Sequence, residues 1–441
     1  MKSLKIKDNQ YKNKEEFFEI KSLINCVADK TLEQLEREGI FVFPEKISES
    51  EDLTKDQVIL RSFNDKYITG NVMGFLGMGE ERLIIESRFN KGEKDYFFQY
   101  LLEKVLEFPN FINWETSASQ DNKIFNVLLF LFPRYLKEAL RKGLFKTYVR
   151  KQYNGINVNG TIDVAAHIKK NTPFVGKIAY SQREYSCNNY LIQLIRHTIE
   201  FIKGKSYGNK LLKIVKEEVK EVIHYTSDYK AGERRKVIDA NQKSIVRHAY
   251  FHEYRTLQKL CLLILGNSQH QYGKGTRNVF GALFDGAWLW EEYMNLLIGE
   301  YFYHPKNKAG EGAQRLFAGN IGLIYPDFIS TDDQECIIAD AKYKPIENIG
   351  NKDYFQVLAY MMRFDAKRGY YLYPEAGESE DLVLALNQGI SYKKNVAPRD
   401  EILVVKHGLK IPDQVTDYED FVEKIMVNEE IFKESLKKKI V

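Results

Sequence analysis

Two aspartates and a lysine in the last third of the chain have the spacing of a metal-dependent hydrolytic site. Asp327 lies in an apolar segment predicted as a strand over residues 321–330, and Asp340 and Lys342 end a second apolar strand over residues 336–342. Side chains alternate between the two faces of a strand, so Asp340 and Lys342 point the same way. A hairpin formed by the two strands would place Asp327 beside them.

Carboxylates that converge at the ends of paired strands repel one another unless a cation lies between them. Oxygen ligands favour Mg²⁺, or Mn²⁺, over zinc. Such a metal lowers the pKa of a coordinated water and neutralises charge on a phosphate, and a neighbouring lysine stabilises the negative charge that develops. The pattern therefore predicts phosphodiester hydrolysis. The plainer alternative is a solvated hairpin with charged edges.

The Asp-x-Lys pattern is weak evidence by itself, because the chain contains it a second time at Asp365-Ala366-Lys367. That copy follows a helical segment and has no Pro-Asp pair upstream. We expect it to be the end of a surface helix, without a catalytic role.

Helices are predicted on both sides of the two strands. The first carries Glu291 and Glu292, and the second carries Gln356 and Tyr360, which are four residues apart and so share a helix face. The predicted order is helix, strand, strand, helix and strand, with helices over residues 288–300 and 353–364 and a last strand over residues 369–374.

The whole chain has 441 residues, which suggests two or three domains. We expect a multidomain α+β protein. Its parts would be a mostly β N-terminal module over residues 1–95, a mainly helical basic middle module over residues 96–270, and a C-terminal α/β domain (helix, mixed sheet, helix, strand) over residues 271–441. The glycine-rich polar segment 266–281 marks the second boundary.

The formal net charge of +4 conceals an uneven distribution. Residues 131–250 contain 24 basic and 10 acidic side chains, whereas the segments before and after them are both net acidic. A basic segment of this kind suits phosphate backbones, although solvated helix faces would give the same count.

Several classes of protein are excluded by the pattern. The most apolar stretch, residues 127–132, is far too short to span a membrane, and no Walker phosphate loop occurs, so we expect the chain itself to bind no nucleotide. The four cysteines show no close pairing, which argues against a zinc knuckle or a disulfide framework. Together with an N-terminus that lacks an apolar signal core, this predicts a cytoplasmic protein.

The chain resembles the PD-(D/E)xK nuclease superfamily and, within it, the McrC-type nuclease subunits of modification-dependent McrBC restriction systems. The resemblance covers most of the chain. It includes Gly160-Thr-Ile-Asp163, Arg183-Glu184, Leu283-Phe-Asp285, Trp290-Glu291, Tyr325-Pro-Asp327, Asp340-Ala-Lys342-Tyr343-Lys344 and Asp353-Tyr-x-Gln356-x-x-x-Tyr360. Cys187 and Gly286 depart from the expected pattern at positions that are not catalytic.

The resemblance implies a role for each site residue. Asp327 and Asp340 would be metal ligands and Lys342 the catalytic lysine. Glu291 would be the helix carboxylate and a third metal ligand, with Glu292 as the alternative. Gln356 would be an accessory polar residue. The domain over residues 271–441 would be the endonuclease, cytoplasmic in a bacterium or archaeon.

The resemblance also implies partners. McrC-type subunits dock through their N-terminal region on a hexameric AAA+ GTPase of the McrB type and stimulate its GTP hydrolysis, and the motor recognises double-stranded DNA that carries methylcytosine. Two other hypotheses stay open. One is a non-catalytic activator of an AAA+ NTPase, and the other is a nuclease that acts without a partner.

Overall fold

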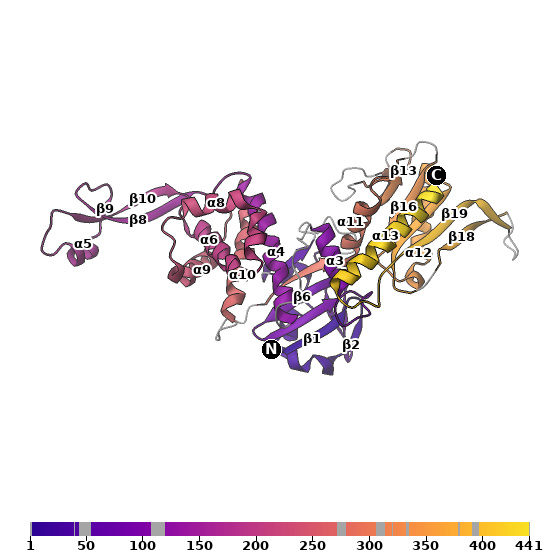
Figure 1. The fold of residues 1–441 in the computed structure, drawn as a ribbon, viewed down its shortest axis with the longest axis horizontal. Coiled ribbons are helices and arrows are strands. Elements are labelled where there is room, and N and C mark those ends of the chain that lie inside the picture. The colour runs from indigo at the N-terminus through magenta and orange to yellow at the C-terminus, as the bar shows by residue number, and fades with distance from the viewer. Residues whose placement is uncertain are drawn as a thin grey trace. The chain divides into compact units, whose positions relative to one another are not determined.

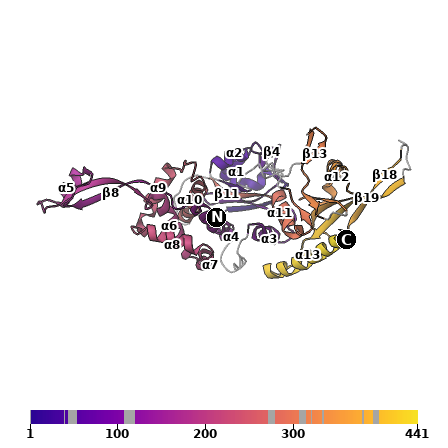
Figure 2. The same cartoon turned by 90° about the horizontal axis from the view of Figure 1, so that it is seen from above.

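The computed structural model describes residues 2–38, 40–43, 54–106, 120–270, 279–305, 314–319, 321–331, 335–377, 380–389 and 397–440. The protein is α+β, with mixed and antiparallel sheets (Figures 1 and 2). It forms two compact units. The first consists of Met1–Phe108 with Arg277–Val441, and the second of Pro109–Thr276.

One sheet of the first unit is built mainly from the N-terminal part of the chain. Its strand order is β1 (Lys2–Lys7), β7 (Glu81–Glu86), β6 (Val72–Met78), β11 (Phe280–Asp285) and β3 (Phe41–Phe43). The core beneath it is formed with η1 (Lys14–Ile20), α1 (Lys21–Val27) and α2 (Leu32–Arg37), and α3 (Tyr96–Val105) follows the sheet. A smaller antiparallel sheet has the order β2 (Tyr11–Asn13), β5 (Lys66–Thr69) and β4 (Leu60–Phe63).

Strand β11 joins the C-terminal segment to this N-terminal sheet. It pairs antiparallel with β6 and parallel with β3, and all six of its residues are buried. Gly74 of β6 has a φ of +133°, and a side chain there would lie 2.1 Å from the carbonyl oxygen of Ala282. The compact units therefore differ from the expected modules, because β11 and α3 both belong to the unit that contains the N-terminal sheet.

A second sheet of the first unit carries the predicted site. Its strand order is β12 (Phe302–Tyr303), β15 (Phe328–Ser330), β16 (Ile337–Ala341), β17 (Arg368–Glu375), β19 (Ala397–Lys410) and β18 (Leu382–Gln388). Helices α11 (Gly286–Ile298), α12 (Asn351–Phe364) and α13 (Tyr418–Ile440) accompany it, with η5 (Ile346–Asn348) before α12. In Figure 2, α12 lies on one side of the sheet and α13 on the other. A separate hairpin is formed by β13 (Gln314–Phe317) and β14 (Ile321–Ile324).

The prediction of one strand over residues 321–330 was wrong. The segment forms two strands in different sheets, because β14 pairs with β13 whereas β15 pairs with β12 and β16. Pro326 lies at the break, and proline has no N–H with which to continue a ladder. The second Asp-x-Lys copy agrees with its prediction, since Asp365 is exposed and caps the end of α12 with a φ of 52°.

The second unit consists of helices and one antiparallel sheet. Helix α6 (Tyr190–Lys203) buries its apolar face, which confirms the amphipathic pattern of that segment. The other helices are α4 (Gln120–Leu140), α5 (Val164–Lys170), α7 (Gly208–Lys213), α8 (Lys216–Tyr225), η3 (Ala231–Glu233), α9 (Arg234–Lys243) and α10 (Glu253–His270). The sheet has the order β8 (Thr147–Gly155), β10 (Ile178–Ser186) and β9 (Thr161–Ile162).

No helix in the described part of the chain combines the length and apolar character that a membrane span requires.

Candidate active site

Asp327 and Asp340 come to the same end of the sheet because strands β15 and β16 pair antiparallel. Phe328 of β15 is opposite Ala339 of β16, so Asp327, immediately before β15, lies at the end of β16 that carries Asp340. The Ala341 N–H donates to Oδ2 of Asp327 at 2.8 Å and fixes that carboxylate. Both aspartates are almost fully buried, with 2% and 0% of their surface exposed.

Lys342 completes this group. Its Nζ atom lies 2.7 Å from Oδ2 of Asp340 and donates to Oε1 of Gln356 at 3.4 Å. Gln356 is oriented in turn, because its Nε2 donates to the Tyr360 hydroxyl at 2.7 Å. The backbone of Lys342 is held by a hydrogen bond to the Leu372 carbonyl in β17. The structure thus brings Asp327, Asp340, Lys342 and Gln356 together.

Glu291 approaches from helix α11. The helix begins where the buried Asp285 accepts a hydrogen bond from the Ala287 N–H, and the Trp290 indole donates to the Leu372 carbonyl at 2.9 Å. This contact docks α11 on β17. Glu291 and Glu292 follow Trp290 and are both partly buried.

His304 links Glu291 to Asp327, and sequence reasoning missed it. Its Nδ1 lies 2.7 Å from the main-chain oxygen of Asp327, and its Nε2 lies 3.7 Å from Oε1 of Glu291. The ring stacks on Phe328 at 5.0 Å between centroids. An isolated histidine before a proline has no motif to reveal it, so only the fold shows this contact.

The electrostatics of the site centre on Asp340. Burial raises the pKa of its carboxyl, the Lys342 ammonium opposes that rise, and the carboxylates of Asp353 and Glu291 reinforce it. Asp353 has its own cation, because Lys344 Nζ lies 3.0 Å from its Oδ1. Burial acts to raise the pKa of Asp353, but the Gly350 N–H and Lys344 outweigh that effect and hold it below the ordinary value.

The residues present fit a small divalent cation. Oδ1 of Asp340 is buried and has no hydrogen-bond partner among the described residues, as expected of an oxygen that awaits a ligand. Mg²⁺ is commonly held by only one or two carboxylates, with waters in its other positions. Within the described part of the chain, no group of three or more His, Cys, Asp or Glu side chains is arranged so that it could hold a metal ion. The Glu291 carboxylate lies next to the His304 ring, with its Oε1 3.7 Å from Nε2.

The N-terminal sheet supports the strand end that carries the site. The buried Tyr343 hydroxyl lies 2.7 Å from Ser87 Oγ, and its ring contacts Phe89. Gly286 lies against the same ring, since a side chain there would come within 2.6 Å of it. The unexpected glycine at position 286 is therefore explained by the packing of Tyr343.

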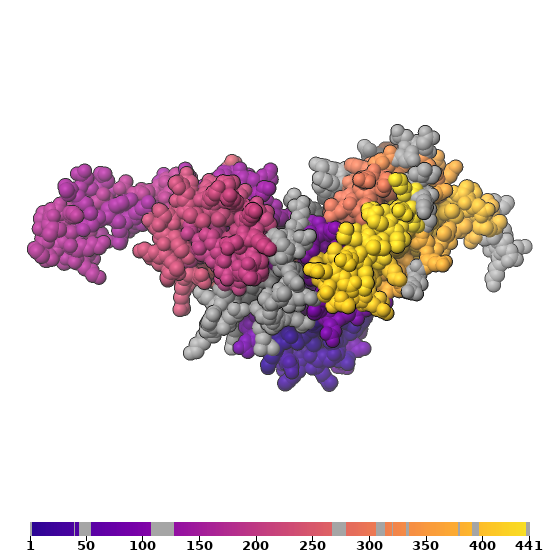
Figure 3. Space-filling model, in the orientation of Figure 1, coloured from indigo at the N-terminus to yellow at the C-terminus, as the bar shows by residue number. Residues whose placement is uncertain are grey.

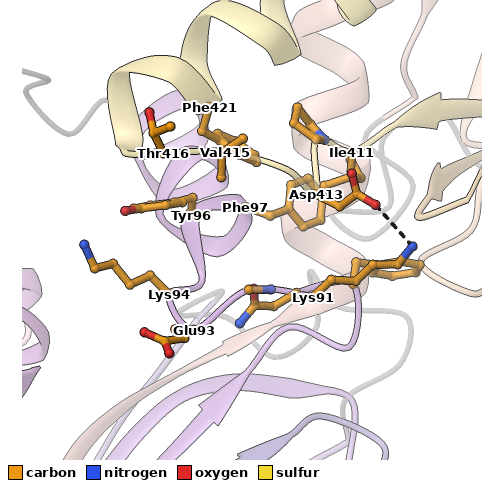
Figure 4. Close-up of a pocket in the computed structure, with 14 residues that line it drawn as sticks. Lys91, Glu93, Lys94, Tyr96, Phe97, Ile411, Asp413, Val415, Thr416 and Phe421 are labelled. Atoms are coloured by element: carbon orange, nitrogen blue, oxygen red, sulfur yellow. Dashed lines mark hydrogen bonds and ion pairs between the residues drawn. The ribbon is translucent and has the colours of Figure 1, made fainter.

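A separate cleft of ≈ 260 Å³ in the same unit contains none of the predicted site residues (Figure 4). It lies between residues 89–97 and residues 411–421, and Lys91 and Asp413 face each other across it at 3.7 Å. Its lining has no cluster of carboxylates, so we place the candidate active site at the end of β16 and not in this cleft.

Comparison with solved structures finds distant similarity to two complexes from Thermococcus gammatolerans. One is the refined half-complex from a tetradecameric assembly of McrB AAA+ hexamers with bound McrC, with 12% identity, a TM-score of 0.44, and coverage of 97% of this chain and 99% of that chain. The other is a cryo-EM structure of the McrBC complex, with 12% identity, a TM-score of 0.32, and coverage of 69% and 89%. No curated protein sequence gives a significant match.

A family model gives the assignment. The model described as McrBC 5-methylcytosine restriction system component matches residues 68–374, which is more than half of the 441-residue chain. The matched range contains Asp327, Asp340 and Lys342. The chain therefore belongs to the family of McrBC 5-methylcytosine restriction system components.

Proposed function

We propose that the chain is the Mg²⁺-dependent DNA endonuclease subunit of a methylcytosine-specific restriction system, with a nuclease core of the PD-(D/E)xK type. The observation that carries this proposal is the buried pair of Asp327 and Asp340 with Lys342 2.7 Å from Asp340. Membership of the McrBC family supports the same conclusion. A purely structural role would not require a buried, unsatisfied carboxylate oxygen.

Asp327 and Asp340 would hold the metal, with Glu291 as the nearest further carboxylate. When bound, Mg²⁺ would supply an activated water and charge neutralisation at the scissile phosphate. Lys342 would stabilise the negative charge that develops on the phosphate oxygens. Gln356 and Tyr360 would keep the Lys342 ammonium in position through their hydrogen bonds.

The proposed partner is a hexameric AAA+ GTPase of the McrB type. The sequence lacks a Walker loop, so nucleotide hydrolysis would take place on that partner. McrB hexamers with bound McrC are the subject of the Thermococcus complex, and we extend that association to this chain as part of the proposal. The motor would recognise the methylated duplex, and this chain would cleave it and stimulate GTP hydrolysis.

The test is cleavage of a methylcytosine-containing duplex in Mg²⁺, with and without the cognate motor and GTP. We expect cleavage only when motor and GTP are both present. Rapid cleavage by the chain alone would favour the independent nuclease. A raised GTPase rate of the motor without any strand cleavage would favour the non-catalytic activator.

A further inference from the structure

Tyr371 lies beside Asp340 on the next strand of the sheet. In the parallel pairing of β16 with β17, Asp340 is opposite Tyr371, and in the pairing of β17 with β19, Tyr371 is opposite Lys406. Residues that are opposite each other in a parallel pair project to the same face of the sheet. The three side chains therefore form a row on the face that α12 covers, where Tyr371 packs in the same apolar core as Val357.

The hydroxyl group of Tyr371 is not explained by packing. The residue is completely buried, and its hydroxyl has no hydrogen-bond partner among the described residues. Folded proteins rarely contain such a group, because it gives up its hydrogen bonds to water and receives none in return. A phenylalanine would fill the same space without this cost.

The polar groups around Tyr371 differ in whether they already have partners. The Lys406 ammonium donates to two main-chain oxygens in the segment before α12, at 3.2 and 2.8 Å, and the Asp353 carboxylate pairs with Lys344 at 3.0 Å. Oδ1 of Asp340, by contrast, is buried and accepts no hydrogen bond from any residue that the structure describes. An unsatisfied donor and an unsatisfied acceptor thus lie on neighbouring strands and on one face.

The electrostatics of the hydroxyl also connect it to the candidate active site. Burial raises the pKa of Tyr371, and the negative charges of Asp340 and then Asp353 raise it further. The Lys342 ammonium opposes this rise. The phenol is therefore protonated at neutral pH and can donate to a carboxylate, and Asp340 is the charged group that acts on it most strongly.

We propose that Tyr371 is a positioning residue for Asp340, and that its hydroxyl is the hydrogen-bond donor that orients the Asp340 carboxylate for the metal. In the structure, the Lys342 ammonium compensates this carboxylate at Oδ2. A bound metal would share that compensation, and the carboxylate would then accept from Tyr371 at its other oxygen. The inference rests on the proposed function for the presence of a metal at Asp340.

Titration calorimetry with Mn²⁺ on the full-length chain, without DNA or motor, tests the proposal. Tyr371→Phe removes the hydroxyl and keeps the ring, so the fold should survive. We expect this variant to bind Mn²⁺ about tenfold more weakly than wild type, as is common when the partner of a metal ligand is removed. Its urea midpoint without added metal should equal or exceed that of wild type, because a buried hydroxyl without a partner costs stability. A tyrosine with a merely structural role would not give this combination.

Tyr370→Phe is the matched control. Tyr370 is the chain neighbour of Tyr371 in β17 and points to the opposite face of the sheet, where its ring lies near His407. Helix α13, yellow in Figure 3, packs on that side through the stacking of Phe432 on His407. The Tyr370 hydroxyl interacts with the Arg368 side chain, so this variant should lose stability and bind Mn²⁺ like wild type.

Three results would overturn the proposal. They are wild-type Mn²⁺ affinity in Tyr371→Phe, equal losses of Mn²⁺ affinity in Tyr371→Phe and Tyr370→Phe, and a loss of stability in Tyr371→Phe as large as that in Tyr370→Phe. Wild-type cleavage of DNA together with normal Mn²⁺ binding by Tyr371→Phe would remove this inference alone.

Asp340→Asn separates the inference from the proposed function. Equal Mn²⁺ binding by Asp340→Asn and wild type would show that Asp340 holds no metal, and both proposals would fail. Weaker Mn²⁺ binding by Asp340→Asn and Tyr371→Phe, in a wild-type chain that does not cleave DNA with its motor, would remove the proposed function and leave the role of Tyr371 intact.

Discussion

The Lys342 ammonium lies 2.7 Å from Oδ2 of Asp340, inside a site where the aspartate is completely buried and the lysine side chain is only 11% exposed. A buried carboxylate that loses its cation is left as an uncompensated charge, which is more costly than the absence of both groups. The pair therefore makes a prediction about stability that does not depend on activity.

Lys342→Met should destabilise the metal-free protein by about 3 kcal/mol, because Asp340 would then be buried without its partner. The double variant Asp340→Asn/Lys342→Met should recover most of that loss. Urea unfolding of the two variants and of Asp340→Asn measures the coupling. Additive effects of the single substitutions would show that the two side chains do not interact.

His304→Ala should weaken metal binding about 10- to 100-fold, because residues that orient a ligand commonly have effects of that size. The histidine donates to the main chain of Asp327 and lies beside Glu291. Titration calorimetry with Mn²⁺ provides the measurement. The His304→Asn variant retains a side-chain donor and should bind Mn²⁺ more tightly than the alanine variant. Equal Mn²⁺ affinities of the two variants would show that His304 does not orient the metal ligands.

Gly286→Ala should lower the stability of the first unit by about 1 to 3 kcal/mol, since the added methyl group would meet the buried Tyr343 ring at 2.6 Å. Gly232→Ala is the matched control, because nothing lies within 4 Å of its side-chain position. Thermal unfolding of both variants decides the point. A Gly286→Ala protein as stable as wild type would contradict the packing argument.

His197 should make stability depend on pH. It is fully buried, and neither ring nitrogen has a hydrogen-bond partner among the described residues. Burial, and then the charges of Arg234 and Arg196, lower its pKa from 6.5 to about 4. Between these values the unfolded chain binds a proton that the folded chain does not, so stability falls as the pH decreases from 6.5 to 4.

Urea unfolding between pH 7 and pH 4.5 tests this expectation. His197→Leu removes the titrating group and should reduce the loss of stability over that interval by about 1 to 2 kcal/mol. Identical pH profiles for wild type and the variant would show that His197 does not titrate in this range.

Part of the candidate site could be predicted from local pattern. The continuous apolar run before Asp340 predicts a buried strand, and helical spacing places Gln356 and Tyr360 on one face, where they form a hydrogen bond. The contact of Asp327 with the end of β16 required the pairing of the two strands, which the structure forms with a shorter first strand than expected.

Other features depend on contacts between distant segments and could not be predicted. Strand β11 pairs with β6, about two hundred residues earlier in the chain, and no local pattern indicates that partner. The placement of His304 next to Asp327 depends on the pairing of β12 with β15.

Cleavage by Asp340→Asn is the most direct test of the proposed site. The substitution keeps the shape of the side chain and removes its charge, so the fold should survive. With the cognate motor, GTP and Mg²⁺, we predict that the variant retains partner stimulation and duplex binding but cleaves methylated DNA at least about a thousandfold more slowly than wild type. Cleavage at the wild-type rate would contradict the assignment of Asp327, Asp340 and Lys342 as the hydrolytic site.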